Sequence, residues 1–199
     1  MLTIGIEIND VIRNIKKQIL KYYQKDYDNS LDLDNIDDKE DILKKYIDFG
    51  GQSKFKEFMY IDYPYEIFGC AKVVDKDLAS ELTKWMYNLT NYEDDEIRVV
   101  YYSLDEEAIS IQSTFFFLSR IGTRVREVIF PSSMDELKGK FDAMITANSE
   151  VINKFNNFTR IVKINREWNE NDECFLNYDS MLDIINDKDF IKKITKYGK

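Results

Sequence analysis

The chain has 199 residues, 44% of them hydrophobic, which suits one domain, or one domain plus a small appendage, and argues against a disordered polypeptide. Its formal net charge of −9 opposes non-specific binding to phosphate backbones, so no nucleic-acid partner is expected. Histidine is absent, which excludes serine–histidine and cysteine–histidine nucleophiles and leaves carboxylates, hydroxyls, lysines and a hard cation such as Mg²⁺ for any chemistry.

The first expected elements are a strand and a helix. Residues Leu2–Ile8 are apolar up to Glu7 and predict a short buried strand. Apolar residues recur at helical spacing through Val11–Lys25 and predict an amphipathic helix. Asp26–Asp41 is acidic with little apolar periodicity, and we expect a loop and a domain boundary there.

The next part of the chain, Lys39–Asn91, is mostly helical in pattern and rich in aromatic residues. Gly50-Gly51 interrupts the pattern. Pro64 predicts a turn, because proline fixes its own backbone and pushes its neighbour out of the helical region. Asp75 is a good N-cap for the helix that follows.

The rest of the chain alternates strands with helices. The strand patterns cover Glu96–Ser103, Val125–Phe130, Phe141–Thr146 and Arg160–Ile164. The helical patterns cover Asp105–Ile121, Ser132–Lys140, the stretch SEVINKF at 149–155, and Tyr178–Thr195. Such alternation predicts an α/β fold, a Rossmann-like parallel sheet of about five strands with helices on both faces.

The predicted domain organisation follows from this order. We expect residues 1–28 and 96–199 to form the α/β core. Residues 29–95 are expected to form a mostly helical, aromatic-rich cap inserted after the first strand–helix unit. In such sheets, ligands bind at the carboxyl ends of the strands.

Polar side chains stand at the ends of the predicted strands. They are Glu7, Asn9 and Asp10 after the first strand, Ser103 after the second, and Thr146 and Asn148 after the fourth, with Lys138 and Lys140 shortly before it. Together with the order of elements, they resemble the haloacid dehalogenase-like (HAD-like) phosphatases, and most nearly the 5'(3')-deoxyribonucleotidase type. The likeness covers nearly the whole chain by element order, but few motif positions by residue type.

The resemblance implies a phosphatase site whose first motif has changed. The family ends its first strand with an Asp nucleophile and an Asp acid/base, and Glu7 and Asn9 take those places here. Glu7 is one methylene longer, and misplacing an attacking atom by ~1 Å can cost on the order of 10²-fold in rate. Asn9 cannot transfer a proton as a carboxyl does, a loss of typically ~10²–10⁴-fold. Ser103 and either Lys138 or Lys140 match the residues that hold the phosphate.

The metal motif that the resemblance implies is also weakened. The family's fourth strand ends in acidic residues that bind Mg²⁺, whereas Thr146 and Asn148 bring no charge to a cation that prefers carboxylates. If a metal binds at all, Glu7 and Asp10 are its expected ligands. We therefore expect no catalytic residue and no cofactor.

Each of these positions also has a purely structural explanation. Ser103 and Glu106 have the spacing of a capping box for the following helix, and Asn148 is a natural N-cap. Asn9-Asp10 could cap the first helix. Lys138 and Lys140 could be ordinary solvent-exposed lysines without a role in a site.

Three functional hypotheses follow. The preferred one is a catalytically degenerate HAD-like domain, a pseudoenzyme that acts as a protein-interaction or structural component. The composition suggests an AT-rich genome and suits a phage-encoded protein of a virion or tail assembly. The alternatives are an active Mg²⁺-dependent phosphatase or 5'-nucleotidase that uses Glu7 and Asp10, and a non-catalytic binder of a nucleotide or phosphate.

Further patterns bear on partners and compartment. Cys70 and Cys174 lack CxxC spacing and predict reduced thiols in an intracellular, cytoplasmic protein. No apolar run approaches the ~20 residues that span a bilayer, and no signal-peptide pattern is present, so no membrane association is expected. A protein partner or self-assembly is expected instead, through aromatic residues of the insert: Tyr60, Tyr63, Tyr65 and Phe68.

Overall fold

The computed structural model describes residues 1–199 except for 28–29, 31, 34–49, 91–96, 105 and 196–199. Its six-stranded parallel sheet has the order β3-β2-β1-β4-β5-β6. The strands are β1 (Leu2–Glu7), β2 (Ile97–Tyr102), β3 (Val128–Ile129), β4 (Ala143–Thr146), β5 (Arg160–Ile164) and β6 (Leu176–Tyr178). The predicted Rossmann-like α/β fold is therefore confirmed, with one strand more than expected.

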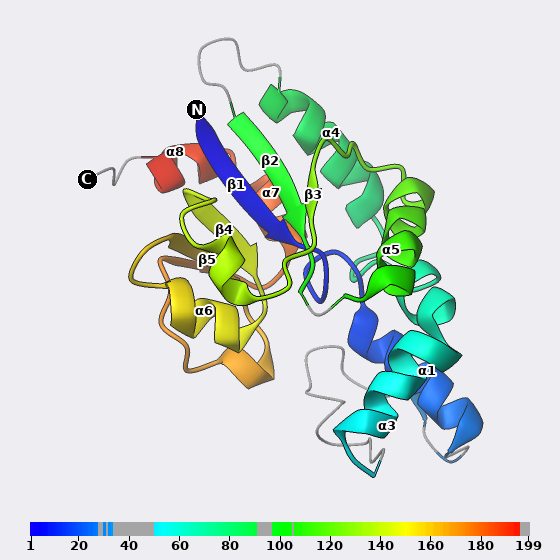
Figure 1. The fold of residues 1–199 in the computed structure, drawn as a ribbon. Helices are drawn as coiled ribbons and strands as arrows, with labels where there is room; N and C mark the ends of the chain where they lie inside the picture. Colours follow the sequence, from blue (N-terminus) through cyan, green and yellow to red (C-terminus); the bar gives the residue numbers. More distant parts are fainter. Residues whose placement is uncertain (28–29, 31, 34–49, 91–96, 105, 196–199) are drawn as a thin grey trace.

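Helices lie on both faces and at one end of this sheet (Figure 1). The α-helices are α1 (Ile15–Asp26), α3 (Gln52–Glu57), α4 (Leu78–Thr90), α5 (Ala108–Arg120), α6 (Ser149–Phe155), α7 (Met181–Asn186) and α8 (Phe190–Thr195). The described residues also form two π-helical turns, η2 (Phe58–Asp62) and η3 (Tyr65–Gly69), and the 3₁₀ turns η4 (Met134–Leu137) and η5 (Glu167–Asn169). None of the described helices combines the length and apolar character needed to cross a membrane.

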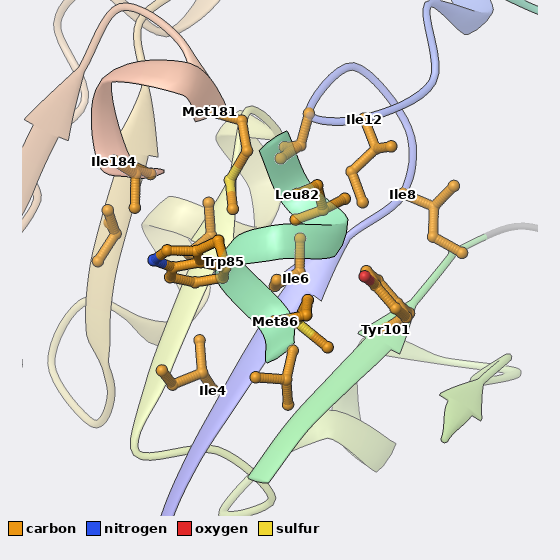
Figure 2. Close-up of a cluster of buried hydrophobic side chains, with 14 of the residues drawn as sticks. Ile4, Ile6, Ile8, Ile12, Leu82, Trp85, Met86, Tyr101, Met181 and Ile184 are labelled. Atoms are coloured by element: carbon orange, nitrogen blue, oxygen red, sulfur yellow. The ribbon is translucent and has the colours of Figure 1, made fainter. Parts of the chain in front are cut away.

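The sheet is buried on both faces by two apolar layers. On one face, Ile4 and Ile6 of β1 and Tyr101 of β2 pack against α4, α5, α7 and α8. Figure 2 shows this layer, with Leu82, Trp85 and Met86 of α4 lying over β1. On the other face, Val100 and Tyr102 of β2 and Met144 of β4 pack against η4 and α6. Burial on both faces explains why the central strands are nearly continuous apolar runs.

A third apolar cluster joins α1 to the inserted segment. Ile15, Ile19 and Tyr23 of α1 pack against Phe58 and Phe68 of the π-helical turns. Among the described residues, we use the word cap for this cluster of α1, Leu33 and residues 52–70, whereas α4 packs in the sheet layer. The apolar face of α4 packs on the sheet and that of α1 packs on the aromatic insert, and the domain split at 29–95 stays a prediction.

Several elements have other ends than predicted: β3 is shorter than Val125–Phe130, and a 3₁₀ turn replaces the helix predicted at Ser132–Lys140. Two further differences have a clear local cause. The first helix begins at Ile15 rather than Val11, because the chain after β1 forms a closed loop before entering α1. The predicted helix over 178–195 is split into α7 and α8. Asp187 lies at the break, where its side chain accepts hydrogen bonds from the backbone N–H of Asp189 at 3.0 Å and from the Tyr178 hydroxyl at 2.6 Å. Such side-chain bonds compete with the helical backbone pattern.

Candidate functional site

The carboxyl ends of β1, β2 and β4 meet at the centre of the sheet and bring six of the predicted site residues together. Asn9 Nδ2 donates to Ser103 Oγ at 3.3 Å, which links the ends of β1 and β2. Thr146 Oγ1 donates to the Glu7 carboxyl group, which links β1 to β4. Asp10 and Asn148 line the same cavity as Glu7 and Asn9. This is the edge at which parallel α/β sheets bind ligands.

A tight loop after β1 determines which side chains reach this edge. The Ile8 carbonyl accepts from the backbone N–H groups of Ile12 and Arg13, and the Asp10 N–H donates to the Arg13 carbonyl at 2.8 Å. Asp10 adopts a left-handed backbone with φ of 58°, a region that Asp tolerates better than most residues. Asn14 then caps α1 through the Lys17 N–H at 3.1 Å. As a result Arg13 turns inward, with no exposed surface.

The guanidinium group of Arg13 forms hydrogen bonds at the ends of β1 and β2 and with η3 and α5. Its Nε donates to Asn9 Oδ1 at 2.9 Å, and one terminal nitrogen lies 2.7 Å from Glu106 Oε1 and 3.5 Å from Ser103 Oγ. The other terminal nitrogen donates to the Phe68 carbonyl at 3.0 Å and to Thr114 Oγ1 at 2.5 Å. The Asn9 amide and the Ser103 hydroxyl are thus held by Arg13.

The charge of Arg13 is balanced inside the protein. The side chains of Arg13 and Glu106 have no exposed surface, and the Thr114 hydroxyl also lies within hydrogen-bond distance of both Glu106 oxygens. The guanidinium carbon lies 5.1 Å and 5.5 Å from the ring centres of Phe68 and Phe117. Burial lowers the pKa of Arg13, and the nearby Glu106 carboxylate opposes that shift.

Glu7, the last residue of β1, is 3% exposed. Burial, with a smaller contribution from the charge of Asp10, raises the pKa of Glu7 to about 8, although hydrogen bonds from Thr146 and Ala147 lower it in part. At neutral pH this side chain is therefore mostly a neutral carboxylic acid. A neutral carboxyl group is a poor nucleophile and a poor ligand for a hard cation.

A cavity of about 540 Å³ lies between this edge of the sheet and the cap. Phe55, Met59 and Tyr60 of the insert line one side, and Glu7 and Asp10 line the other. The cap therefore closes over the strand ends. Burial raises the pKa of Asp10, and the nearby charges of Lys16 and Arg166 oppose the shift.

Trp168 forms a further part of the cavity wall. Its indole N–H donates to the Ala147 carbonyl at 2.9 Å, and Lys16 Nζ lies 3.2 Å from the centre of its ring. Arg166 donates to the Asp10 carbonyl at 3.0 Å. The η5 turn after β5 thus fixes the loop that follows β1.

The two predicted lysines are not part of this site. Lys138 and Lys140 are exposed and precede β4, whereas Glu7 ends the parallel strand β1. Asp142 donates its N–H to the Thr3 carbonyl near the start of β1, which places the preceding residues at the amino end of the sheet. Lys138 Nζ lies 5.5 Å from the ring centre of Phe158.

Of the three helix caps predicted among the site residues, one is present in the structure and two are not. Asn148 caps α6 as predicted, because its side chain accepts from the Glu150 N–H at 2.9 Å. The capping box of Ser103 with Glu106 is wrong: α5 begins after Glu107, whose N–H donates to Ser110 Oγ at 2.9 Å. Asn9-Asp10 does not cap α1, since Asn14 does.

The four aromatic residues expected at an interface have different environments. Tyr65 is exposed. Phe68 is buried, and Tyr60 stacks on it with ring centres 5.6 Å apart. Tyr63 is half-buried and donates its hydroxyl to Asp26. Three of the four therefore build the cap, and only Tyr65 is available to a partner.

Sequence reasoning missed the residue at the centre of the site, Arg13. The available signal was an arginine inside the apolar run that follows the first strand, four residues after Asn9. A buried arginine needs an acidic partner, and Glu106 could be found only from the fold, because 93 residues separate the two.

Comparison with protein-family models found no match for this chain, and comparison with curated protein sequences found no significant match.

Proposed function

We propose that this chain is a non-catalytic HAD-like domain that works as a protein-interaction or structural component. The observation that carries the proposal is the buried Arg13–Glu106 pair, which holds Asn9 and Ser103 at the positions of the family's acid/base and phosphate-holding residues. The amino-acid composition suggests an AT-rich genome, and we extend the proposal to a phage-encoded assembly protein.

The donor groups at the site do not fit the Mg²⁺ ion that the resemblance implies. Glu7 is mostly protonated at neutral pH and bonded to Thr146, and the Asn9 amide oxygen accepts from Arg13. Asp10 remains as a single carboxylate beside Lys16 and Arg166. Among the described residues, no three acidic or cysteine side chains form a group that could hold a metal ion.

We expect no Mg²⁺-dependent release of phosphate from nucleoside monophosphates or p-nitrophenyl phosphate. The double variant Glu7→Asp/Asn9→Asp should also be inactive, because Arg13 still occupies the space between β1 and β2 and no acidic pair ends β4. A colorimetric phosphate assay measures both. Wild-type turnover that requires Mg²⁺ and disappears in Glu7→Ala would overturn the proposal.

The interaction surface is the outer side of α5, at the right-hand side of the molecule in Figure 1. This α5 apolar face consists of exposed residues of the helix and of the adjoining turn η3: Ile109, Phe115, Phe116 and Tyr65. The rings of Tyr65 and Phe116 are in contact, with centres 5.2 Å apart. Clustered exposed aromatic residues are typical of protein interfaces.

The charges at the ends of α5 support a second copy of the chain as its partner. Exposed Glu107 precedes the helix, and exposed Arg120, whose guanidinium group also donates to the Ala71 carbonyl, ends it. Two copies related by a two-fold axis with antiparallel α5 helices would place Glu107 of each near Arg120 of the other. Such isologous pairing is the commonest way in which identical chains associate.

We therefore expect concentration-dependent dimerisation in sedimentation velocity experiments. The double variant Phe115→Ser/Phe116→Ser should remain monomeric, because it removes two exposed rings from the α5 apolar face. Phe158→Ser, which removes an exposed ring outside this face, should dimerise like the wild type. A wild-type chain that stays monomeric at millimolar concentration contradicts the role of this face in self-assembly.

A further inference from the structure

A second cavity, of about 790 Å³, lies on the other side of α1. Asn14, Lys17, Gln18 and Lys21 line it, a spacing that places them on one face of the helix, whereas Ile15, Lys16 and Ile19 line the cavity of the candidate site. Residues of the segment 72–76 and of the end of α5 also line it. The two cavities are thus separate.

The described residues that line this second cavity carry a charge opposite to that of the whole chain. Five cationic residues line it: Lys17, Lys21, Lys72, Lys76 and Arg120. No Asp or Glu of the described residues is part of the lining, although Asp75 and Asp77 flank Lys76 in the sequence. In a chain of net charge −9, such a concentration of one sign produces a local positive potential that attracts anions.

The floor of the cavity is aliphatic. Val73, Val74 and Ile121 line it together with Leu33, and no aromatic side chain of the described residues takes part. A nucleobase or other flat ring would find no ring to stack on. An alkyl chain, in contrast, gains from burial against valine and isoleucine side chains.

Hydrogen bonds fix the walls relative to one another. The Asn14 N–H donates to the Lys72 carbonyl and the Val74 N–H donates to the Ile12 carbonyl, both at 2.9 Å. The Arg120 side chain donates to the Ala71 carbonyl. Three segments that lie far apart in the sequence are therefore held together, and a preformed cavity costs a ligand little ordering of the protein.

We propose that this cavity binds a small anionic amphiphile, with a phosphate or carboxylate head among the lysines and a short alkyl chain on the aliphatic floor. The volume lies within the range of small-molecule sites in proteins, roughly 300–1,000 Å³. This inference does not depend on the proposed function, because it uses none of the residues at the strand ends.

Isothermal titration calorimetry at physiological ionic strength, with the full chain, tests the proposal. The probes are two series of soluble ligands, alkyl phosphates and alkyl carboxylates from butyl to octyl. We expect one-to-one binding that tightens by about fourfold for each methylene that becomes buried. Tighter binding of the phosphates identifies a phosphate head, and equal or tighter binding of the carboxylates identifies a carboxylate head; either result supports the site.

Two double variants separate this site from general charge attraction. Lys72→Ala/Lys76→Ala removes two cations of the lining and should weaken binding by about tenfold or more. Lys54→Ala/Lys56→Ala removes the same charge from exposed positions of α3 outside the lining and should bind like the wild type.

Three results would overturn the proposal. One is the absence of binding at millimolar ligand. Another is an equal loss of affinity in the two double variants, which would indicate general charge attraction and no specific site. The third is binding to vesicles of anionic phospholipid without binding to any soluble alkyl anion, which would indicate a membrane-surface patch instead.

Discussion

Replacement of Arg13 by alanine is expected to lower the free energy of unfolding by about 3–5 kcal/mol. The substitution leaves the Glu106 carboxylate, whose side chain has no exposed surface, without its cationic partner. It also removes the donors to Asn9 and Thr114. A whole domain is stable by only roughly 5–15 kcal/mol, so the loss should be plain in urea denaturation followed by circular dichroism.

Two further variants test whether burial causes this effect. Arg98→Ala breaks an ion pair with Glu127 whose side chains are 47% and 36% exposed, and it should cost less than about 1 kcal/mol. Arg13→Met/Glu106→Leu replaces both buried charges by apolar groups and should be clearly more stable than Arg13→Ala. If Arg13→Ala costs no more than Arg98→Ala, Arg13 does not occupy the interior of the site.

The free energy of unfolding is expected to fall as the pH rises from about 4.5 to about 8, because of Glu7. Its pKa is about 8 in the folded protein, against 4.5 in an ordinary setting. Between these values the folded chain keeps a proton that the unfolded chain has released. Stability therefore decreases by at most about 1.4 kcal/mol per pH unit and levels off above the folded pKa.

Comparison with Glu7→Gln isolates this contribution. The amide stays neutral at every pH, so the variant should gain stability relative to the wild type across this window. Urea denaturation at a series of pH values measures the difference. Glu57→Gln, at an exposed position of α3, provides the matched control and should follow the wild type. A Glu7→Gln curve that runs parallel to the wild type would show that Glu7 is ionised in the fold, and would remove one support of the non-catalytic proposal.

The alternation of strands and helices predicted most of the sheet layer, since each element carries its own periodicity. The pattern RIVKI gives the bounds of β5, and SEVINKF those of α6. The strand β6 escaped prediction because its three residues are only partly buried or exposed and show no apolar run. The split between α7 and α8 depends on bonds to Asp187, of which the one from Tyr178 comes from another element.

The sequence predicted the location of the candidate site better than the residues that form it. Parallel strands bring their carboxyl ends to one edge, so Glu7, Ser103 and Thr146 were expected to meet there. Arg13 was not, because its inward position results from the closed loop after β1 and from a left-handed Asp10. Lys138 and Lys140 lie at the opposite edge of the sheet, because they come just before the start of β4, and a strand parallel to β1 starts at the edge opposite to the carboxyl end of β1.

By itself, the sequence determined the fold class and excluded histidine chemistry. It also indicated that a site would lie at the carboxyl end of the first strand. These properties follow from local periodicity and from residue type, which do not depend on contacts between distant segments. The tertiary structure alone decided that Arg13 pairs with Glu106, that Glu7 holds its proton near neutral pH, and that five cations of an acidic chain line one cavity. Burial and charge neighbours set these properties, and both arise only when segments far apart in the chain come together.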